Sequence, residues 1–215
     1  MLLSKNDKLV IIGDSVTDCG RRQPVGEGLG DSMGNGYANL VNSFLTAVYP
    51  QLGIRVINMG TSGNTVRDLK ARWQRDVLDL NPDWLSICIG INDVWLQYDQ
   101  PLIPESHVYL PEYEATLTEL VALTRPRLKG LILMTPYYME PNRADQMRAS
   151  IDQYGAAVKR IAAAHDCILV DTQAAFDAVF PYIYPATLGW DRVHPNAAGH
   201  AIMARAFLGG VRFEW

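Results

Sequence analysis

Short apolar segments alternate with amphipathic segments along the whole chain. Five of the apolar segments end at, or are followed directly by, Gly, Pro, Asn or Asp, which is typical of buried strands. They cover residues 9–12, 53–58, 84–90, 130–135 and 167–170. Strands that alternate with helices indicate an α/β fold, in which helices cover both faces of a parallel sheet.

The segments between these strands carry apolar residues at steps of three and four, as amphipathic helices do. After the second strand, for example, Val66, Leu69 and Trp73 share one face, and Thr65 can cap the helix that carries them. The predicted helices cover residues 37–49, 65–77, 111–124, 144–164, 172–180 and 196–207. Residues 94–110 carry several aromatic residues and prolines, and we expect them to form an irregular loop near a site.

These elements predict one three-layer α/β/α domain over residues 1–215, with a five-stranded parallel sheet in the flavodoxin-like order 2-1-3-4-5. In that order the carboxyl ends of the first three strands lie side by side. A polar cluster follows each of them: Asp14-Ser15, Ser62-Gly63-Asn64 and Asn92-Asp93. We therefore expect a functional site at this edge of the sheet, where open α/β sheets place their ligands.

Ser15 is the candidate nucleophile of this edge. Serine is also a favoured helix cap, and its position alone favours neither interpretation. A nucleophilic serine needs a base and a carboxylate that orients the base. Asp191 and His194 offer that pair on the loop after the fifth strand, although the same DxxHP pattern also suits a turn that leads into a helix.

Hydrolysis of an ester also needs donors for the oxyanion of the tetrahedral intermediate. Gly63 allows close approach of its backbone N–H, Asn92 offers a side-chain amide, and the Ser15 N–H can be the third donor. Taken singly, Gly63 suits a turn and Asn92 suits a cap. Together with Ser15, Asp191 and His194 they favour acyl transfer.

Composition narrows the classes of function. Of the 215 residues 48% are hydrophobic and 20% charged, and the net charge of −4 includes no basic run, as in an ordinary globular protein that does not bind nucleic acid. No apolar stretch reaches the ~18 residues of a membrane span, and the N-terminal residues lack the pattern of a signal peptide, so we expect a cytoplasmic protein. Three widely spaced cysteines without a CxxC motif indicate neither a disulfide framework nor a zinc site. We expect no metal and no cofactor.

Two alternatives come from other classes of protein. A metal-dependent phosphatase of the haloacid dehalogenase type would use Asp14 as nucleophile and Asp93 or Asp171 as magnesium ligands, but Val16 stands where such enzymes carry a second Asp. A non-catalytic carbohydrate-binding module can share the same fold. Such a module would need no combination of nucleophile, base and oxyanion donors.

Four sequence blocks resemble, in order, those of the SGNH (GDSL) hydrolase superfamily: GDSV at 13–16, NMGTSGNT at 58–65, GIND at 90–93 and DRVHP at 191–195. The chain departs from the family pattern at Val16, where the family name has Leu. The resemblance implies a serine esterase with Ser15 as nucleophile, His194 as base and Asp191 as its orienting carboxylate. It also implies an oxyanion hole formed by Ser15, Gly63 and Asn92.

Further segments, such as SGNTVRDLKARW and WDRVHP, are similar to the intracellular acetylxylan esterase branch of that superfamily. This likeness implies removal of acetyl groups from xylo-oligosaccharides and assembly into homo-oligomers. A short-chain carboxylesterase or a lysophospholipase-type esterase is the alternative within the same chemistry. Asp14, Trp95, Tyr184 and Trp190 are the candidate substrate contacts, and residues 20–36 are a candidate lid.

Overall fold

A parallel five-stranded sheet forms the centre of the computed structural model, which describes residues 1–28 and 30–215. The strand order is β2-β1-β3-β4-β5, which confirms the predicted 2-1-3-4-5 order. The strands are β1 (Lys8–Gly13), β2 (Arg55–Asn58), β3 (Trp84–Cys88), β4 (Gly130–Met134) and β5 (Ile168–Val170). Every neighbouring pair is parallel, so all five carboxyl ends lie at one edge.

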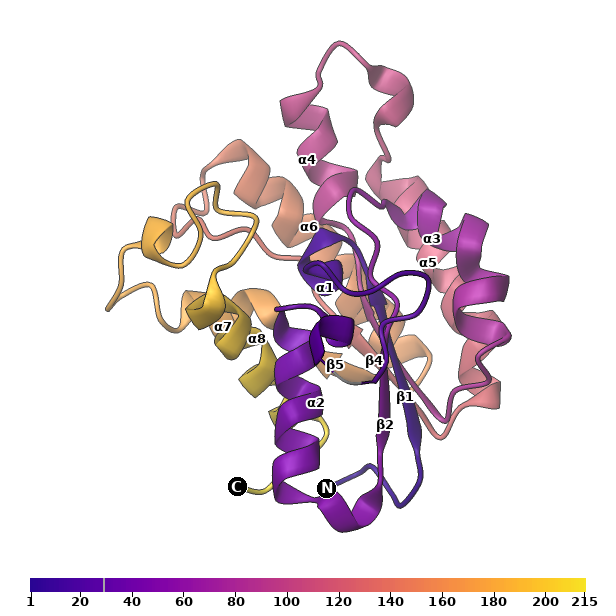
Figure 1. The fold of residues 1–215 in the computed structure, drawn as a ribbon. Helices are drawn as coiled ribbons and strands as arrows, with labels where there is room; N and C mark the ends of the chain where they lie inside the picture. The colour runs from indigo at the N-terminus through magenta and orange to yellow at the C-terminus, as the bar shows by residue number, and fades with distance from the viewer. Residues whose placement is uncertain (29) are drawn as a thin grey trace.

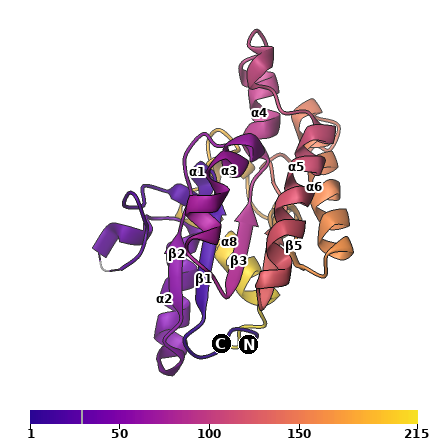
Figure 2. The same ribbon diagram turned by 90° about the vertical axis from the view of Figure 1, so that its right-hand side faces the viewer.

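Helices cover both faces of the sheet and complete the predicted three layers (Figure 1). They are α1 (Ser15–Asp18), α2 (Tyr37–Val48), α3 (Val66–Trp73), α4 (Ile91–Asp99), α5 (Leu110–Thr124), α6 (Gln146–Ala164), α7 (Thr172–Asp177) and α8 (Ala197–Gly210). Helices α3, α5 and α6 pack on one face, and α2, α7 and α8 pack on the other. In Figure 2, α4 projects from one end of the molecule, and both termini lie at the opposite end.

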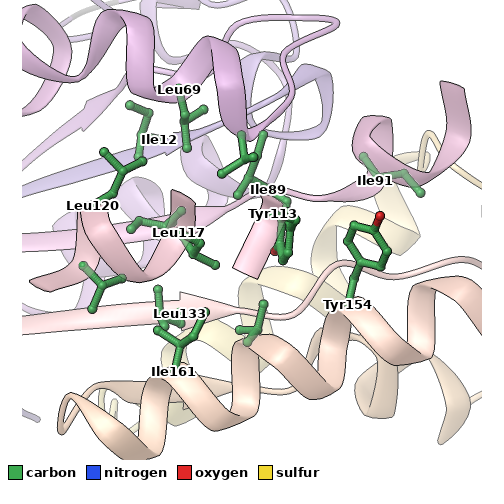
Figure 3. Packing of buried hydrophobic residues seen from close by; sticks show 14 of the residues in the cluster. Ile12, Leu69, Ile89, Ile91, Tyr113, Leu117, Leu120, Leu133, Tyr154 and Ile161 are labelled. Carbon is green, nitrogen blue, oxygen red and sulfur yellow. The ribbon is translucent and has the colours of Figure 1, made fainter. Parts of the chain in front are cut away.

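The two-residue repeat of each strand divides the core into two clusters. In β1, Val10 and Ile12 point to one face, whereas Leu9 and Ile11 point to the other, and all four are fully buried. Figure 3 shows the first cluster, in which Ile12 and Leu133 of the sheet meet side chains of three helices: Leu69, Leu117, Leu120 and Ile161. A sheet buried on both faces explains why its strands read as continuous apolar runs.

Helix α4 corrects the prediction of an irregular stretch from residue 94. Gly90 has a φ of +128°, a conformation that only glycine adopts freely, and the helix begins at the next residue. Ile91 and Val94 are buried three residues apart, as one helical face requires. The predicted helix over 65–77 is also divided, because α3 passes at Gln74–Leu78 into a π-helical turn. The candidate lid over 20–36 includes residue 29, which lies outside the described residues.

Candidate active site

Ser15 stands at the turn between β1 and α1. Asp14, not Ser15, caps this short helix, because its carboxylate accepts a hydrogen bond from the Val16 N–H at 3.0 Å. Ser15 is therefore the first residue of α1, and the interpretation of Ser15 as a cap is wrong. Its hydroxyl stays available for chemistry at the carboxyl edge of the sheet.

Asp14 is buried, with 1% of its surface exposed. Burial raises the pKa of its carboxyl group to about 7, against the opposite effects of the Val16 N–H and of His194. A side chain so buried supports the Ser15 turn and offers almost no surface to a substrate, in contrast to its prediction as a substrate contact. The same burial leaves Asp14 unable to act as the nucleophile of a phosphatase.

Ser15, His194 and Asp191 form a continuous hydrogen-bonded relay. Ser15 Oγ lies 2.9 Å from His194 Nε2, and His194 Nδ1 lies 2.7 Å from Asp191 Oδ2. Burial would raise the pKa of Asp191, but hydrogen bonds from the ring and backbone of His194 outweigh this effect and lower it. An ionised carboxylate can only accept, so Nδ1 carries the proton and Nε2 presents a lone pair to the serine hydroxyl.

The loop that carries this pair is tightly held. Asp191 Oδ1 accepts hydrogen bonds from the N–H groups of Val193 and His194, at 2.9 and 2.8 Å. Arg192 takes a left-handed conformation with a φ of +64°, which turns the chain between the two catalytic candidates. The Tyr137 hydroxyl donates to the Val193 carbonyl at 3.0 Å. These contacts fix the imidazole before any substrate arrives.

The candidate oxyanion donors follow the carboxyl ends of β1, β2 and β3. Gly63 has a φ of +80°, and Asn92, 4% exposed, is at the start of α4. One hydrogen of the Asn92 amide is donated to the Asn64 carbonyl at 2.9 Å, which leaves the other available. Among the described residues, the backbone N–H groups of Ser15 and Gly63 donate to no protein acceptor. Three donors are thus free for a developing negative charge.

Sequence reasoning missed the residues that hold these loops. Ser62 donates its N–H and its hydroxyl to the Asp18 carboxylate, at 3.1 and 2.7 Å, and this fixes the chain beside Gly63. The fully buried Asn58 side chain donates to the carbonyls of Thr17 and Met33, at 2.7 and 2.9 Å. Most of these partners are backbone atoms, which leave no pattern in a sequence.

A groove lined by both sequence neighbours of Asp191 holds two of the candidate substrate contacts. Trp190 and Tyr184 are 85% and 75% exposed and line a groove of about 460 Å³ with Arg192 and Glu140, which form an ion pair. Trp95 does not line this groove. Its ring lies edge-on to the ring of His194, at a centroid distance of 5.6 Å. Exposed aromatic faces and charged groups suit a polar ring such as a sugar better than an acyl chain.

Other nucleophiles and metal ions find little support in the part of the chain that the structure describes. The three cysteines are unpaired, and burial raises the pKa of the Cys19 thiol to about 12, so it stays protonated. No group of three or more His, Cys, Asp or Glu side chains is placed to hold a metal ion among the described residues.

None of the described helices has the length and apolar character that a membrane span requires.

Comparison with known proteins assigns the family. The family model of the GDSL-like lipases and acylhydrolases matches residues 11–202. The chain belongs to the GDSL-like lipase/acylhydrolase family. This family membership agrees with the resemblance drawn from the four sequence blocks.

Relatives of this GDSL-like family member match it over its whole length. An acetylxylan esterase from Geobacillus stearothermophilus is 60% identical over 100% of this chain and 98% of its own. The crystal structure of that enzyme, Axe2, superposes with a TM-score of 0.99, as does a catalytic mutant of it, S15A, at 59% identity and the same coverage. LAE5, an alpha/beta hydrolase from the metagenome of Lake Arreo, is 54% identical over 99% of this chain and 98% of its own, with a TM-score of 0.97.

Proposed function

We propose that this protein is a carboxylic ester hydrolase that removes acetyl groups from acetylated xylo-oligosaccharides. Ser15 is the nucleophile, His194 the general base and Asp191 the carboxylate that orients it. The observation that carries the proposal is the 2.9 Å contact between Ser15 Oγ and His194 Nε2, with Asp191 behind the same ring. The 60% identity to an acetylxylan esterase supports the choice of substrate.

The first half of the reaction forms an acyl-enzyme. His194 Nε2 takes the proton of the Ser15 hydroxyl while Oγ attacks the acetyl carbonyl carbon. The charge that develops on the carbonyl oxygen is stabilised by the N–H groups of Ser15 and Gly63 and by the Asn92 amide. The bond to the sugar oxygen then breaks, and His194 gives its proton to the leaving alcohol.

The second half repeats these steps with water in place of serine. His194 deprotonates the water, the hydroxide attacks the acetyl-Ser15 carbonyl, and Ser15 leaves with the proton from the imidazolium. Asp191 stays ionised throughout and stabilises the imidazolium that forms twice in each cycle. No step in this sequence calls for a metal or a redox cofactor.

The groove of Trp190 and Tyr184 supports a saccharide as the alcohol part of the ester. Aromatic rings offer a flat face to the C–H side of a sugar, and the nearby ion pair offers hydrogen bonds to its hydroxyl groups. We therefore propose Trp190, Tyr184 and Trp95 as substrate contacts. A lysophospholipase would instead need an apolar surface for its acyl chain.

The deciding experiment compares acetate release from an acetylated xylo-oligosaccharide with hydrolysis of a medium-chain acyl ester, for the native protein and Ser15→Ala. We expect the sugar ester to be the better substrate and Ser15→Ala to lose activity by on the order of 10⁴-fold or more. Preference for the longer ester would move the substrate to the lipid-type esterases. Full activity of Ser15→Ala would refute the proposed site.

We also propose that the protein forms homo-oligomers in the cytoplasm. Two exposed aromatic residues outside the proposed sugar groove, Tyr182 and Trp215, offer apolar surface to a second copy. The three unpaired cysteines agree with a reducing compartment. Sedimentation at micromolar concentration and cell fractionation test the two proposals; a monomeric mass would refute the first, and recovery outside the cytoplasm the second.

A further inference from the structure

Arg72 lies in the last turn of α3 and points toward the carboxyl edge of the sheet. Its side chain is only 9% exposed. The guanidinium donates to four acceptors: Asn64 Oδ1 at 2.6 Å, the Met59 carbonyl at 2.7 Å, Asp76 Oδ2 at 2.8 Å and the Gly13 carbonyl at 2.9 Å. A buried cation with four different acceptors connects several segments at once.

Two of these acceptors are backbone groups at the ends of β1 and β2. Gly13 is the last residue of β1 and stands two positions before Ser15, and Met59 directly follows β2. The Gly13 carbonyl also accepts the Thr61 N–H at 3.0 Å. Arg72 therefore holds the turn that carries the nucleophile against the loop that leads to Gly63.

The third acceptor leads to the oxyanion hole. Arg72 Nε binds the side chain of Asn64, the residue that follows Gly63. The backbone carbonyl of the same Asn64 accepts one hydrogen of the Asn92 amide at 2.9 Å. Because the amide is planar, holding one of its hydrogens fixes the direction of the other. The Arg72 guanidinium thus contacts Asn64, the residue that follows one oxyanion donor, Gly63, and holds the other, Asn92.

The fourth acceptor keeps the guanidinium in place. Asp76 is buried in the π-helical turn that follows α3, and it accepts from both Arg72 and Arg75. Burial would raise the pKa of Asp76, but the two guanidinium groups outweigh this effect and lower it. The carboxylate therefore stays charged and anchors Arg72 from behind.

We infer that Arg72 is a positioning residue for the esterase reaction: it keeps the Ser15 turn in register with the loop that supplies Gly63 and orients Asn92. This inference rests on the proposed function of the same site. Lysine cannot replace it, because an ammonium group is a point charge without the planar fork that reaches acceptors on both sides. Loss of the Arg72 contacts should lower kcat, because the oxyanion develops only during the reaction, and should leave the binding of the sugar unchanged.

The experiment measures kcat, KM and thermal midpoint for Arg72→Lys, Asn64→Ala and Asn64→Asp. We expect Arg72→Lys to lower kcat by roughly 10- to 100-fold with KM changed by less than about threefold. Asn64→Ala lowers kcat in the same direction. Asn64→Asp keeps an acceptor for Arg72 Nε and is expected to retain at least about fivefold more activity than Asn64→Ala.

The matched control is Lys70→Ala on the same helix. Lys70 is exposed and pairs with the exposed Glu119 of α5, so its loss is expected to leave kcat within about twofold of the native value. The kcat of the double variant Arg72→Lys/Asn64→Ala is expected to lie within about threefold of that of Arg72→Lys, because the contact that Asn64→Ala removes, from Arg72 Nε to Asn64 Oδ1, is already lost in Arg72→Lys.

A tetrahedral inhibitor separates positioning from a general loss of structure. Methylboronic acid accepts the Ser15 oxygen at boron and forms an anion shaped like the acetyl intermediate. Its inhibition constant should weaken in Arg72→Lys by the same factor as kcat/KM. A kcat within threefold of the native value, or an unchanged inhibition constant, would overturn the inference. If Arg72→Lys does not fold, equal activities of Asn64→Ala and Asn64→Asp would overturn it, whereas active Ser15→Ala would refute the proposed function itself.

Discussion

Gly13 ends β1 and Gly63 follows β2, and each of these positions favours glycine for a different reason. A Cβ atom on Gly13 would lie 2.3 Å from the Cys88 carbonyl oxygen, a distance that no side chain tolerates. A Cβ atom on Gly63 would meet nothing within 4 Å, and only its φ of +80° favours glycine there. Close approach of two backbones explains the first glycine, and backbone conformation explains the second.

The two substitutions to alanine should therefore differ in unfolding free energy. Gly63→Ala is expected to cost about 1–2 kcal/mol, the price of a left-handed alanine. Gly13→Ala is expected to cost more, because β1 and β3 must move apart in the middle of the sheet. Urea unfolding of both variants makes the comparison, and equal losses would contradict it.

Asn92 offers a test of the oxyanion hole. Asn92→Ala removes one of three donors and is expected to lower kcat by ~100-fold, or about 3 kcal/mol, with Ser15 and His194 intact. Ser15→Ala removes the nucleophile and is expected to lower kcat much further. Steady-state kinetics on one acetyl ester measures both variants. Equal residual activities would contradict the roles assigned to the two residues.

At the residue scale, sequence reasoning found the residues to which we assign the chemistry and missed those that support them. Nucleophilic catalysis needs a serine, a histidine and a carboxylate, and distinct sequence blocks carry these residue types at Ser15, Asp191 and His194. Arg72 and Asn58 act on backbone carbonyls and neighbouring loops. Any segment offers such carbonyls, so only the folded chain shows which ones are contacted.

At the element scale, the strands were easier to predict than the segments at their carboxyl ends. Strands buried on both faces are continuous apolar runs, whereas α4 carries the polar residues Asn92 and Asp93 in its first turn, and its part from residue 94 was expected to be a loop. Those polar residues are nevertheless buried, Asn92 beside Asn64 and Asp93 as acceptor of the Val66 N–H at 3.0 Å. Buried polar residues interrupt the apolar pattern by which a helix is recognised in a sequence.

The contact between α6 and α7 depends on one buried cation. Arg148 of α6 is almost fully buried and donates to both oxygens of Asp177, at 2.9 and 2.7 Å. Arg148→Met would remove both of these bonds and leave Asp177 with Arg143 and Gln173 as partners, and it is expected to cost about 2–3 kcal/mol of unfolding free energy. Urea unfolding measures the loss.

Arg143 provides the control for this prediction. It pairs with the same Asp177 at 3.2 Å, but its side chain is largely exposed. Arg143→Ala is expected to cost less than about 1 kcal/mol, because solvent screens exposed ion pairs. Similar losses for the two variants would show that burial is not what makes the Arg148 contact strong.

At the scale of the whole molecule, two buried acids should make stability fall as the pH rises. Burial raises the pKa of Asp14 from 3.8 to about 7 and that of Asp93 from 3.8 to about 8. Between the unfolded and folded pKa values the native state holds protons that the unfolded state has lost. Rising pH therefore favours unfolding from about pH 4 to about pH 8.

Asp93→Asn removes one of these two groups and keeps the acceptor for the Val66 N–H. We expect urea midpoints of the native protein to decrease between pH 5 and pH 8 and the variant to show a smaller decrease. A single cooperative transition at each pH would support our proposal that residues 1–215 form one domain. Parallel pH profiles of the two proteins would contradict the role given to Asp93.

Metal removal is expected to have no effect on the reaction. Serine acyl transfer needs no Lewis acid, and the described residues include no cluster of three potential metal ligands. Acetate release is therefore expected to be equal before and after dialysis against EDTA. Loss of activity that magnesium or zinc restores would contradict the mechanism.

Ser15 and His194 meet across 179 positions of sequence. A ribosome exposes Ser15 among the first residues of the chain, but the base that activates it emerges near the end of translation. In the proposed mechanism, a chain that ends before residue 194 lacks the base, so it is expected not to react with esters in its surroundings while its core is incomplete. Hydrolytic activity is thus expected to begin only when the fold is nearly complete, and the time of its onset can be used to measure when folding on the ribosome is completed.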